Sequence, residues 1–204
     1  MNKKRAWLSV TLAVSIAILA ACAATPANRT KVTGTWKDAQ FNKKLSHILI
    51  VSLADEPGIR SKVENRFVRR LTVEGVRAAA SSELMSPEEK IDRQTVSAAM
   101  AGKDFDGVLV SRLIGVASDM TYVPPQPNTS FDTGLLRGVP MVTAPGRMEH
   151  RSVVSLQIDL YDPSGEGRLV WSLTSQSFNP DNVTELIANV SDAIVSDLKA
   201  KGLI

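Results

Sequence analysis

The sequence predicts an α/β (α+β) domain in which helices back a mixed β-sheet, in two or three layers. The first observation is a continuous apolar run at His47–Leu53, typical of a strand buried on both faces. The second is the helix-spaced apolar pattern after it, and the third is the alternation of apolar and polar residues at Val153–Tyr161. The predicted order is βαβαβ followed by ββα, with a long arm between the third and fourth strands.

The first half alternates strands and helices. After the strand at 47–53, a helix is predicted that ends at Gly75, a residue suited to a left-handed C-terminal cap. A weaker strand follows at Val76–Ser81, then a helix at Ser86–Ala101 and a strand at Val108–Gly115. Crossovers of this length predict that the first three strands are parallel. The buried side of the first helix is predicted to hold Ile59, Val63, Phe67 and Leu71.

The second half predicts a hairpin and a final helix. The strand at 153–161 has one apolar and one polar face, Asp162–Gly165 is a turn, and Leu169–Phe178 is the partner strand. Asp181 is a candidate N-cap for a helix whose apolar residues fall in one stripe. These elements complete a single globular domain over residues 36–204.

The connection between the third and fourth strands, residues 117–151, is long for a compact domain. Such connections usually have a function or are disordered, and the apolar content here argues against disorder. Two interpretations stay open: a hairpin arm centred on Asp132–Gly134 that docks a partner, or a flap that covers one face of the sheet. The candidate partner-binding residues are Tyr122, Phe131, Leu135, Leu136 and Met141.

The N-terminal segment has the pattern of a secretory signal: a basic head, then 15 mainly apolar residues from Trp7 to Ala21. The residues Leu19, Ala20 and Ala21 lead into Cys22, the only cysteine of the chain. This arrangement resembles the bacterial lipobox. The resemblance implies a signal peptide at 1–21 that signal peptidase II recognises through Leu19, Ala20 and Ala21, and a lipidated Cys22 at the start of a tether over residues 22–35.

The alternative for this segment is an uncleaved transmembrane helix, but its apolar run is shorter than the roughly 20 residues that span a bilayer. Several acyl chains on one cysteine hold a protein firmly, since each buried methylene contributes about 0.8 kcal/mol. The residue after Cys22 is Ala23 rather than aspartate. By resemblance to enterobacterial sorting rules, this implies the outer membrane, with the domain on the periplasmic face.

Charge and cysteine content argue against a nucleic-acid-binding protein and against a domain stabilised by a disulfide. Three of the 24 basic residues lie in the signal and no acidic residue does, which leaves 21 basic against 21 acidic residues in the mature chain. A nucleic-acid ligand would favour a basic excess, so we expect no nucleic-acid partner. With the lone cysteine acylated, we expect the domain to fold without a disulfide.

The sequence contains no recognisable catalytic or cofactor-binding motif. His47 and His150 have no further Cys or His residues with which to build a zinc site. Neither a Gly-x-Ser-x-Gly nucleophile elbow, nor a Ser-x-x-Lys motif at a helix start, nor a glycine-rich phosphate loop is present. We therefore expect a protein that is not an enzyme and that has no metal and no cofactor.

Two surfaces are candidate sites besides the long connection. Asp55, Glu56, Ser82 and Asp119 are predicted to gather near the carboxyl ends of the parallel strands, where α/β sheets usually bind ligands; the alternative is that they are solvated loop residues and caps. On the first helix, Lys62, Arg66 and Arg69 form a small basic face that suits anionic membrane headgroups. The alternative for this face is an ordinary solvated helix side.

A family resemblance can be stated on these residues. The lipobox, Trp36, the order of elements and the passage Tyr161–Ser172 resemble bacterial lipoproteins whose single domain is similar to the N-terminal domain of TolB and to the curli-secretion lipoprotein CsgG. Within the passage, Asp162 begins the turn and Trp171 is expected in the core. The resemblance implies a non-catalytic, periplasm-facing component of envelope assembly or transport.

The sequence thus leads to two hypotheses about function. The first is a lipid-anchored outer-membrane lipoprotein that binds another envelope protein. The second is an auxiliary lipoprotein of an envelope transport system that binds a small molecule or lipid at the strand ends. A pocket converging on Asp55, Ser82 and Asp119 would favour the second, whereas a filled core with an exposed apolar arm would favour the first.

Overall fold

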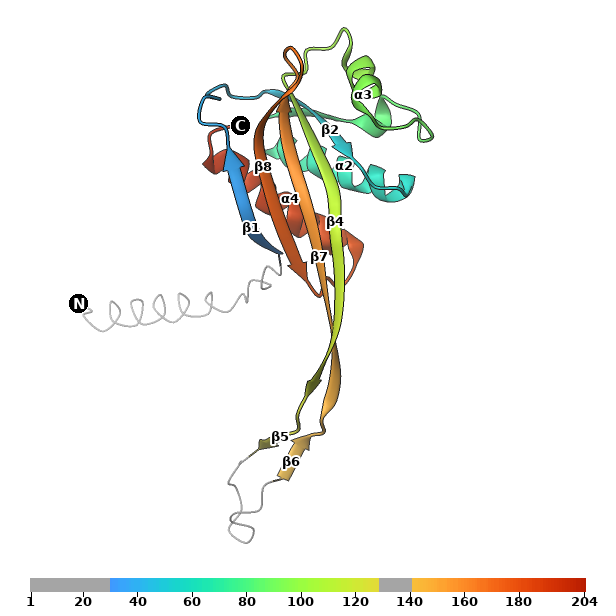
Figure 1. Cartoon of the computed structure of the whole chain (residues 1–204), viewed down its shortest axis with the longest axis vertical. Coiled ribbons are helices and arrows are strands. Elements are labelled where there is room, and N and C mark those ends of the chain that lie inside the picture. Colours follow the sequence, from blue (N-terminus) through green and yellow to red (C-terminus); the bar gives the residue numbers. More distant parts are fainter. Residues whose placement is uncertain (1–29, 129–140) are drawn as a thin grey trace, which may run out of the picture.

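Six strands form one mixed sheet in the order β1-β8-β7-β4-β2-β3 in the computed structural model, which describes residues 30–128 and 141–204 (Figure 1). A separate pair, β5–β6, continues the two strands that project from the sheet. The elements are β1 (Thr30–Lys37), β2 (His47–Ser52), α2 (Pro57–Val73), β3 (Arg77–Ala80), the short 3₁₀ helix η1 (Ser81–Glu83), α3 (Arg93–Met100), β4 (Gly107–Val123), β5 (Gln126–Asn128), β6 (Met141–Ala144), β7 (Arg147–Asp162), β8 (Arg168–Phe178) and α4 (Val183–Ala200).

The predicted α/β class and the parallel first half are confirmed. β2 pairs in parallel with β3 on one side and with β4 on the other, and the remaining neighbours in the large sheet are antiparallel. Gly75 ends α2 with a φ of 82°, the left-handed conformation expected of a C-terminal glycine. The hairpin turn begins at Asp162, whose carboxylate accepts a hydrogen bond from the Ser164 backbone N–H at 3.0 Å.

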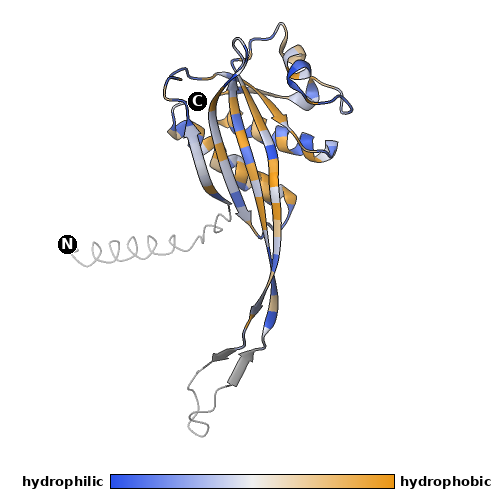
Figure 2. Cartoon of the chain, viewed as in Figure 1, coloured by the Kyte–Doolittle hydropathy of each residue, from blue (hydrophilic) through white to orange (hydrophobic). Residues whose placement is uncertain are grey.

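The main core lies between the sheet and the helices α2 and α4. Phe67 from α2 and Ile194 from α4 pack in one cluster with Trp171 from β8, and all three are almost completely buried. Figure 2 shows the corresponding hydrophobic bands along the central strands. The opposite face of β2 forms a smaller cluster in which Leu49 and Val51 are covered by residues next to α3 and η1. The domain therefore has three layers over β2 and two layers toward β1.

The first strand corrects the predicted tether. The predicted tether includes residues 30–35, but Thr30–Lys37 is an edge strand paired with β8. Thr30 Oγ1 lies 2.7 Å from Ser177 Oγ, and Thr35 Oγ1 donates to Asp197 of α4 at 3.1 Å. The strand is mostly exposed and polar, so it lacks the apolar periodicity by which the other strands were recognised.

The bounds of two helices also differ from the prediction. The predicted helix at 86–101 is helical only as α3, because the Asp92 carboxylate caps the N–H groups of Gln94 and Thr95 and starts the helix there. In α4 the N-cap is Asn182 rather than Asp181, and the Asn182 side chain accepts from Glu185 N at 2.9 Å. The prediction from sequence misplaced the starts of both helices because several capping residues stand close together in each segment.

Residues 117–151 are not a loop along their described length. β4 runs on to Val123 and β7 starts at Arg147, eight and six residues beyond the predicted strand ends at Gly115 and Val153. The two strands stay paired throughout, and Figure 1 shows them leaving the sheet as a ribbon. We call the described ribbon over residues 117–123 and 147–152 the arm. It projects away from the body, so the interpretation as a flap over the sheet was wrong; Asp132–Gly134 lie outside the described residues.

The arm is two-stranded because both neighbouring strands stop short of it. The pairing of β2 with β4 ends at Ser52 and Ser111. β8 ends at Phe178, and the following Asn179 adopts a φ of 44°, a conformation that asparagine tolerates better than most residues. Asn179 N donates to Ser152 O at 2.8 Å, and its side-chain oxygen accepts from Ser152 N at 2.7 Å. Asn179 thus takes the place of a strand residue and ends the pairing of β8 with β7.

Candidate functional site

The arm has two chemically different faces. Because side chains alternate along a strand, Ser118, Met120 and Tyr122 share one face with their cross-strand partners Ser152, His150 and Met148. Met120, Tyr122 and Met148 are 64%, 59% and 60% exposed. The opposite face carries the charged residues, where Glu149 pairs with Arg147 at 3.3 Å and with Arg151 at 3.9 Å. The arm is therefore an amphipathic ribbon whose apolar face has no cover among the described residues.

Tyr122 is held in place by its neighbours on this face. It lies directly opposite Met148, which is the closest kind of cross-strand contact. Its ring also rests on Gly146, where an added Cβ atom would collide with the phenol group. The glycine therefore lets the Tyr122 ring lie against the backbone just before β7 while most of the residue's surface stays in solvent.

The structure tests the predicted partner-binding residues only in part. Tyr122 lies on the apolar face of the arm, and Met141 begins β6. Phe131, Leu135 and Leu136 lie outside the described residues. Sequence reasoning missed Met120 and Met148, although the alternation of polar and apolar residues at 118–122 is the strand signal that would have found them.

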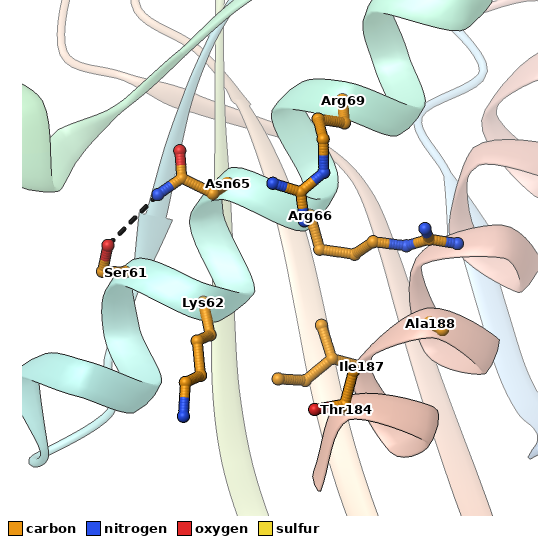
Figure 3. A pocket seen from close by; sticks show the side chains of 8 residues that line it. All are labelled: Ser61, Lys62, Asn65, Arg66, Arg69, Thr184, Ile187 and Ala188. Carbon is orange, nitrogen blue, oxygen red and sulfur yellow. Dashed lines mark hydrogen bonds between the residues drawn. The ribbon is translucent and has the colours of Figure 1, made fainter.

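A second feature is a groove between the middle of α2 and the N-terminal part of α4 (Figure 3). Its volume is about 340 Å³, within the lower range of small-ligand sites. The predicted basic face lines it, since Lys62, Arg66 and Arg69 all belong to its α2 wall. The other lining residues are Ser61 and Asn65 from α2 and Thr184, Ile187 and Ala188 from α4. The structure thus brings the three predicted cations together at one concave surface.

Ion pairs between α2 and α4 fix the groove. Arg66 Nε donates to Ser191 Oγ at 3.1 Å, and its guanidinium lies 3.3 Å from Asp192. Arg70 contacts the same aspartate at 3.0 Å and Glu74 at 2.7 Å. The hydrogen bonds of Glu74 with Lys199 and then Arg70 hold the pKa of this carboxyl below its ordinary value. This network ties the two helices together beside the groove.

The predicted strand-end site is not assembled. Asp119 pairs with Arg151 on the arm, eight residues beyond Ser111, the last β4 residue paired with β2. Eight strand residues span about 26 Å, so Asp119 is far from the β2 end of the sheet. Asp55 and Glu56 are exposed in the turn before α2, and Ser82 lies in η1. The prediction that these residues converge was wrong because β4 is much longer than its sequence pattern suggested.

A buried glutamate occupies the end of β2 instead. Glu64 of α2 is completely buried, and its carboxylate accepts from Ser52 N at 2.9 Å and from Ser82 N at 2.7 Å. Ser81 Oγ donates to it at 2.7 Å, and Arg60 Nε at 3.2 Å. The protein's own carboxylate therefore occupies the place where α/β sheets often bind ligands. Sequence reasoning did not single out Glu64; the i,i+4 spacing of Arg60 and Glu64 on the helix was the available signal.

The two histidines lie in different parts of the molecule. His47 starts β2, and its Nδ1 lies 2.8 Å from Asp104 Oδ1. His150 is on the arm, with Nε2 at 3.3 Å from Ser118 Oγ. Within residues 30–128 and 141–204, no three His, Cys, Asp or Glu side chains are grouped as metal ligands. That no metal, cofactor or catalysis is involved stays a prediction.

The predicted lipidation site lies outside the described residues, as do Leu19, Ala20 and Ala21, which precede Cys22. Among the helices that the structure describes, none is both long enough and apolar enough to cross a membrane.

Comparison with known proteins gives distant structural likenesses. No protein-family model matches the chain, and neither does any curated protein. A PelC dodecamer from Paraburkholderia phytofirmans is 13% identical, with a TM-score of 0.47 over 83% of this chain and 96% of that one. A variant PelC dodecamer from the same organism has a TM-score of 0.44 at 13% identity. A PDZ domain protein from Parabacteroides distasonis has a TM-score of 0.38 at 10% identity, covering 78% and 34% of the two chains. Such low values bear on neither function nor assembly.

Proposed function

We propose that this chain is a non-catalytic, lipid-anchored outer-membrane lipoprotein whose periplasmic domain docks an envelope protein through the arm. The observation that carries the proposal is the apolar face of the arm, on which Met120, Tyr122 and Met148 are each about three-fifths exposed. Apolar groups gathered on one exposed face typically mark an interaction surface, whereas scattered ones do not. Methionine and tyrosine are also enriched at protein interfaces.

The construction of the arm supports docking to a protein. A two-stranded ribbon by itself is marginally stable in water, and a further strand or a covering surface stabilises it. Within the described residues no further strand pairs with either edge of the arm, because the pairing of β2 ends before its base and that of β8 ends at its base. A protein partner can cover the apolar face and also satisfy edge groups.

The position of the N-terminus fits a membrane anchor. Thr30 pairs with Ser177 near the end of β8, at the end of the sheet from which the arm leaves (Figure 1). Cys22 and Thr30 are eight positions apart, and a chain of that length reaches at most about 28 Å. A lipidated Cys22 would therefore hold the arm end of the domain close to the membrane in which partners are embedded.

The second hypothesis, a small molecule or lipid at the strand ends, has less support. Asp119 is on the arm, and Glu64 fills the end of β2 with four internal hydrogen bonds. A ligand there would have to displace a buried carboxylate from donors that already satisfy it, which is unfavourable.

Photo-crosslinking in native membranes tests arm docking. A photoreactive residue replaces Tyr122 or Met148 in the full-length chain, and Val73, a 79% exposed apolar residue at the end of α2, is the matched control. We expect crosslinks to one envelope protein from both arm positions and none from position 73. Equal yields at all three positions, or adducts with lipid alone, would contradict docking of a protein by the arm.

The anchor has its own test. We expect mass spectrometry of the natural product to find a start at Cys22 with acyl chains, and Cys22→Ser to release the protein from the membrane fraction. Because this measurement does not involve the arm, a free thiol at position 22 would refute the anchor and leave the crosslinking result interpretable.

A further inference from the structure

The groove between α2 and α4 has one cationic wall. In Figure 3 the Arg66 side chain reaches across toward α4, whereas Lys62 and Arg69 stay on the α2 side. Lys62 and Arg69 have no ion-pair partner within the parts of the chain that the structure describes. Arg66, in contrast, shares the Asp192 carboxylate with Arg70. Two uncompensated positive charges therefore border the groove, and a third is held rigid beside them.

Neutral hydrogen-bonding groups accompany these charges. Asn65 Nδ2 donates to Ser61 Oγ at 3.1 Å, one helical turn away (Figure 3). The Ser61 oxygen acts there as an acceptor, so its O–H remains a donor. Thr184 supplies a second hydroxyl from the α4 side. Cations combined with hydroxyl donors suit a phosphate group, which offers several acceptor oxygens and negative charge.

The opposite wall is apolar. Ile187 and Ala188 of α4 line the groove, and both are only partly buried. An inorganic anion would gain nothing from this wall, because apolar surface is stabilised by covering it with other apolar groups. The two walls together fit an amphipathic molecule with a phosphate at one side and hydrocarbon at the other.

The groove also lies at the end of the domain where the chain enters. α4 starts shortly after β8, and the end of β8 pairs with Thr30. β2 runs in the direction of β4 toward the same end, so α2 starts there as well. The α4 lining residues belong to the first two turns of that helix, whereas the α2 lining residues run from its second to its fourth turn.

We infer that the α2–α4 groove binds the phosphate headgroup of a membrane phospholipid. Lys62 and Arg69 neutralise the phosphate, Ser61 and Thr184 donate to its oxygens, and Ile187 contacts the glycerol and the first acyl carbons. Arg66, fixed by Ser191 and Asp192, shapes the floor of the site. The inference goes beyond the proposed function, because the groove and the arm share no residue and either can be refuted alone.

Vesicle binding of the chain from residue 23 onward tests this inference, since that chain keeps every described helix and strand. The vesicles contain phosphatidylcholine with phosphatidylglycerol. We expect the double variant K62E/R69E to bind about tenfold more weakly, because each basic group near an anionic surface contributes to attraction. The matched control, K90E/K103E, changes net charge equally on the exposed segment around α3 and is expected to change binding less than about twofold.

Three additional measurements identify the ligand. Ile187→Ser is expected to weaken vesicle binding about threefold through the lost apolar contact. Phosphate-free vesicles of a neutral glycolipid, made equally negative with oleate, are expected to bind more weakly than those with phosphatidylglycerol. Inorganic phosphate in excess is expected not to displace the protein.

Several results would overturn the inference. Equal losses in both charge-reversed variants would show general charge attraction instead of a site. Equal binding to oleate vesicles would remove the role of phosphate, and displacement by inorganic phosphate would assign the groove to a free anion. Thermal unfolding of each variant checks that a loss of binding is not a loss of folding; for a variant that unfolds, the milder pair K62Q/R69Q replaces it.

Discussion

β4 and β7 pass through two different surroundings, the body of the domain and the arm. In the body, Ile158 and Leu160 of β7 are completely buried against α2 and α4. In the arm, Met148 of the same strand and its partner Tyr122 stand mostly in solvent. Apolar alternation therefore specifies which face of a strand is apolar, and only the neighbouring elements decide whether that face is covered.

The comparison also separates two uses of charge. In the body, the Arg60–Glu64 pair is buried and its hydrogen bonds connect α2 to β2 and to η1. In the arm, Glu149 and its arginines form exposed pairs. Removing one partner of the buried pair would leave an uncompensated buried charge, whereas solvent screens the charges of the exposed pairs.

The largest expected effect tests this difference between the buried and the exposed ion pairs. We expect Glu64→Ala to lower the free energy of unfolding by about 3–5 kcal/mol, because it leaves Arg60 buried without its partner. The arm counterpart, Glu149→Ala, is expected to change it by less than about 0.5 kcal/mol. Urea unfolding monitored by circular dichroism measures both, and similar values for the two variants would break the comparison.

The next effect concerns apolar residues of the single strand β7. Ile158→Ala is expected to destabilise the domain by about 2–5 kcal/mol through lost burial and a cavity. Met148→Ala on the arm is expected to stay within about 0.5 kcal/mol, as for ordinary surface positions. If purified Met148→Ala lost much more free energy of unfolding, the arm would be packed against other residues in solution, contrary to the exposure of Met148.

A smaller effect lies at the junction, where α4 starts beside the base of the arm. Asn182→Ala is expected to cost about 1 kcal/mol, since it removes the side-chain acceptor for Glu185 N. Asp181→Ala, one residue earlier, is the control and is expected to have less effect. If thermal unfolding shows a larger loss of stability for Asp181→Ala than for Asn182→Ala, Asp181 is the N-cap of α4.

The smallest effect is a pH dependence confined to the body. Lys199 and Arg70 lower the pKa of Glu74 below its ordinary value of 4.5. A lowered folded-state pKa adds stability at pH values above 4.5, and this stability is lost as the pH falls through the folded-state pKa. We expect Glu74→Gln to be less stable than the parent chain at neutral pH and the difference to shrink in acid. A difference that grows in acid would contradict the assignment.

Local patterns predicted the parts of the fold that they specify directly. The buried strand is confirmed over residues 48–52, although Leu53 is exposed, and the core positions of Phe67, Leu71 and Trp171 are confirmed. Ile59 and Val63, predicted on the same buried side of the helix, are only partly buried. The edge strand Thr30–Lys37 was missed, because a strand exposed on most of its length has no apolar signal. The basic cluster of the groove was found from helical spacing alone, whereas its α4 wall belongs to residues more than 100 positions later.

By itself, the sequence determined the α/β class, the parallel first half, and which side chains of each strand and helix are apolar, because periodicity and turn chemistry act between near neighbours. Only the tertiary structure decided that β4 and β7 outrun their neighbours, that Glu64 closes the end of β2, and that two helices form a groove with unlike walls. The physical reason is that the ends of pairing, the burial of a charge and the shape of a cavity all depend on contacts between segments far apart in the chain.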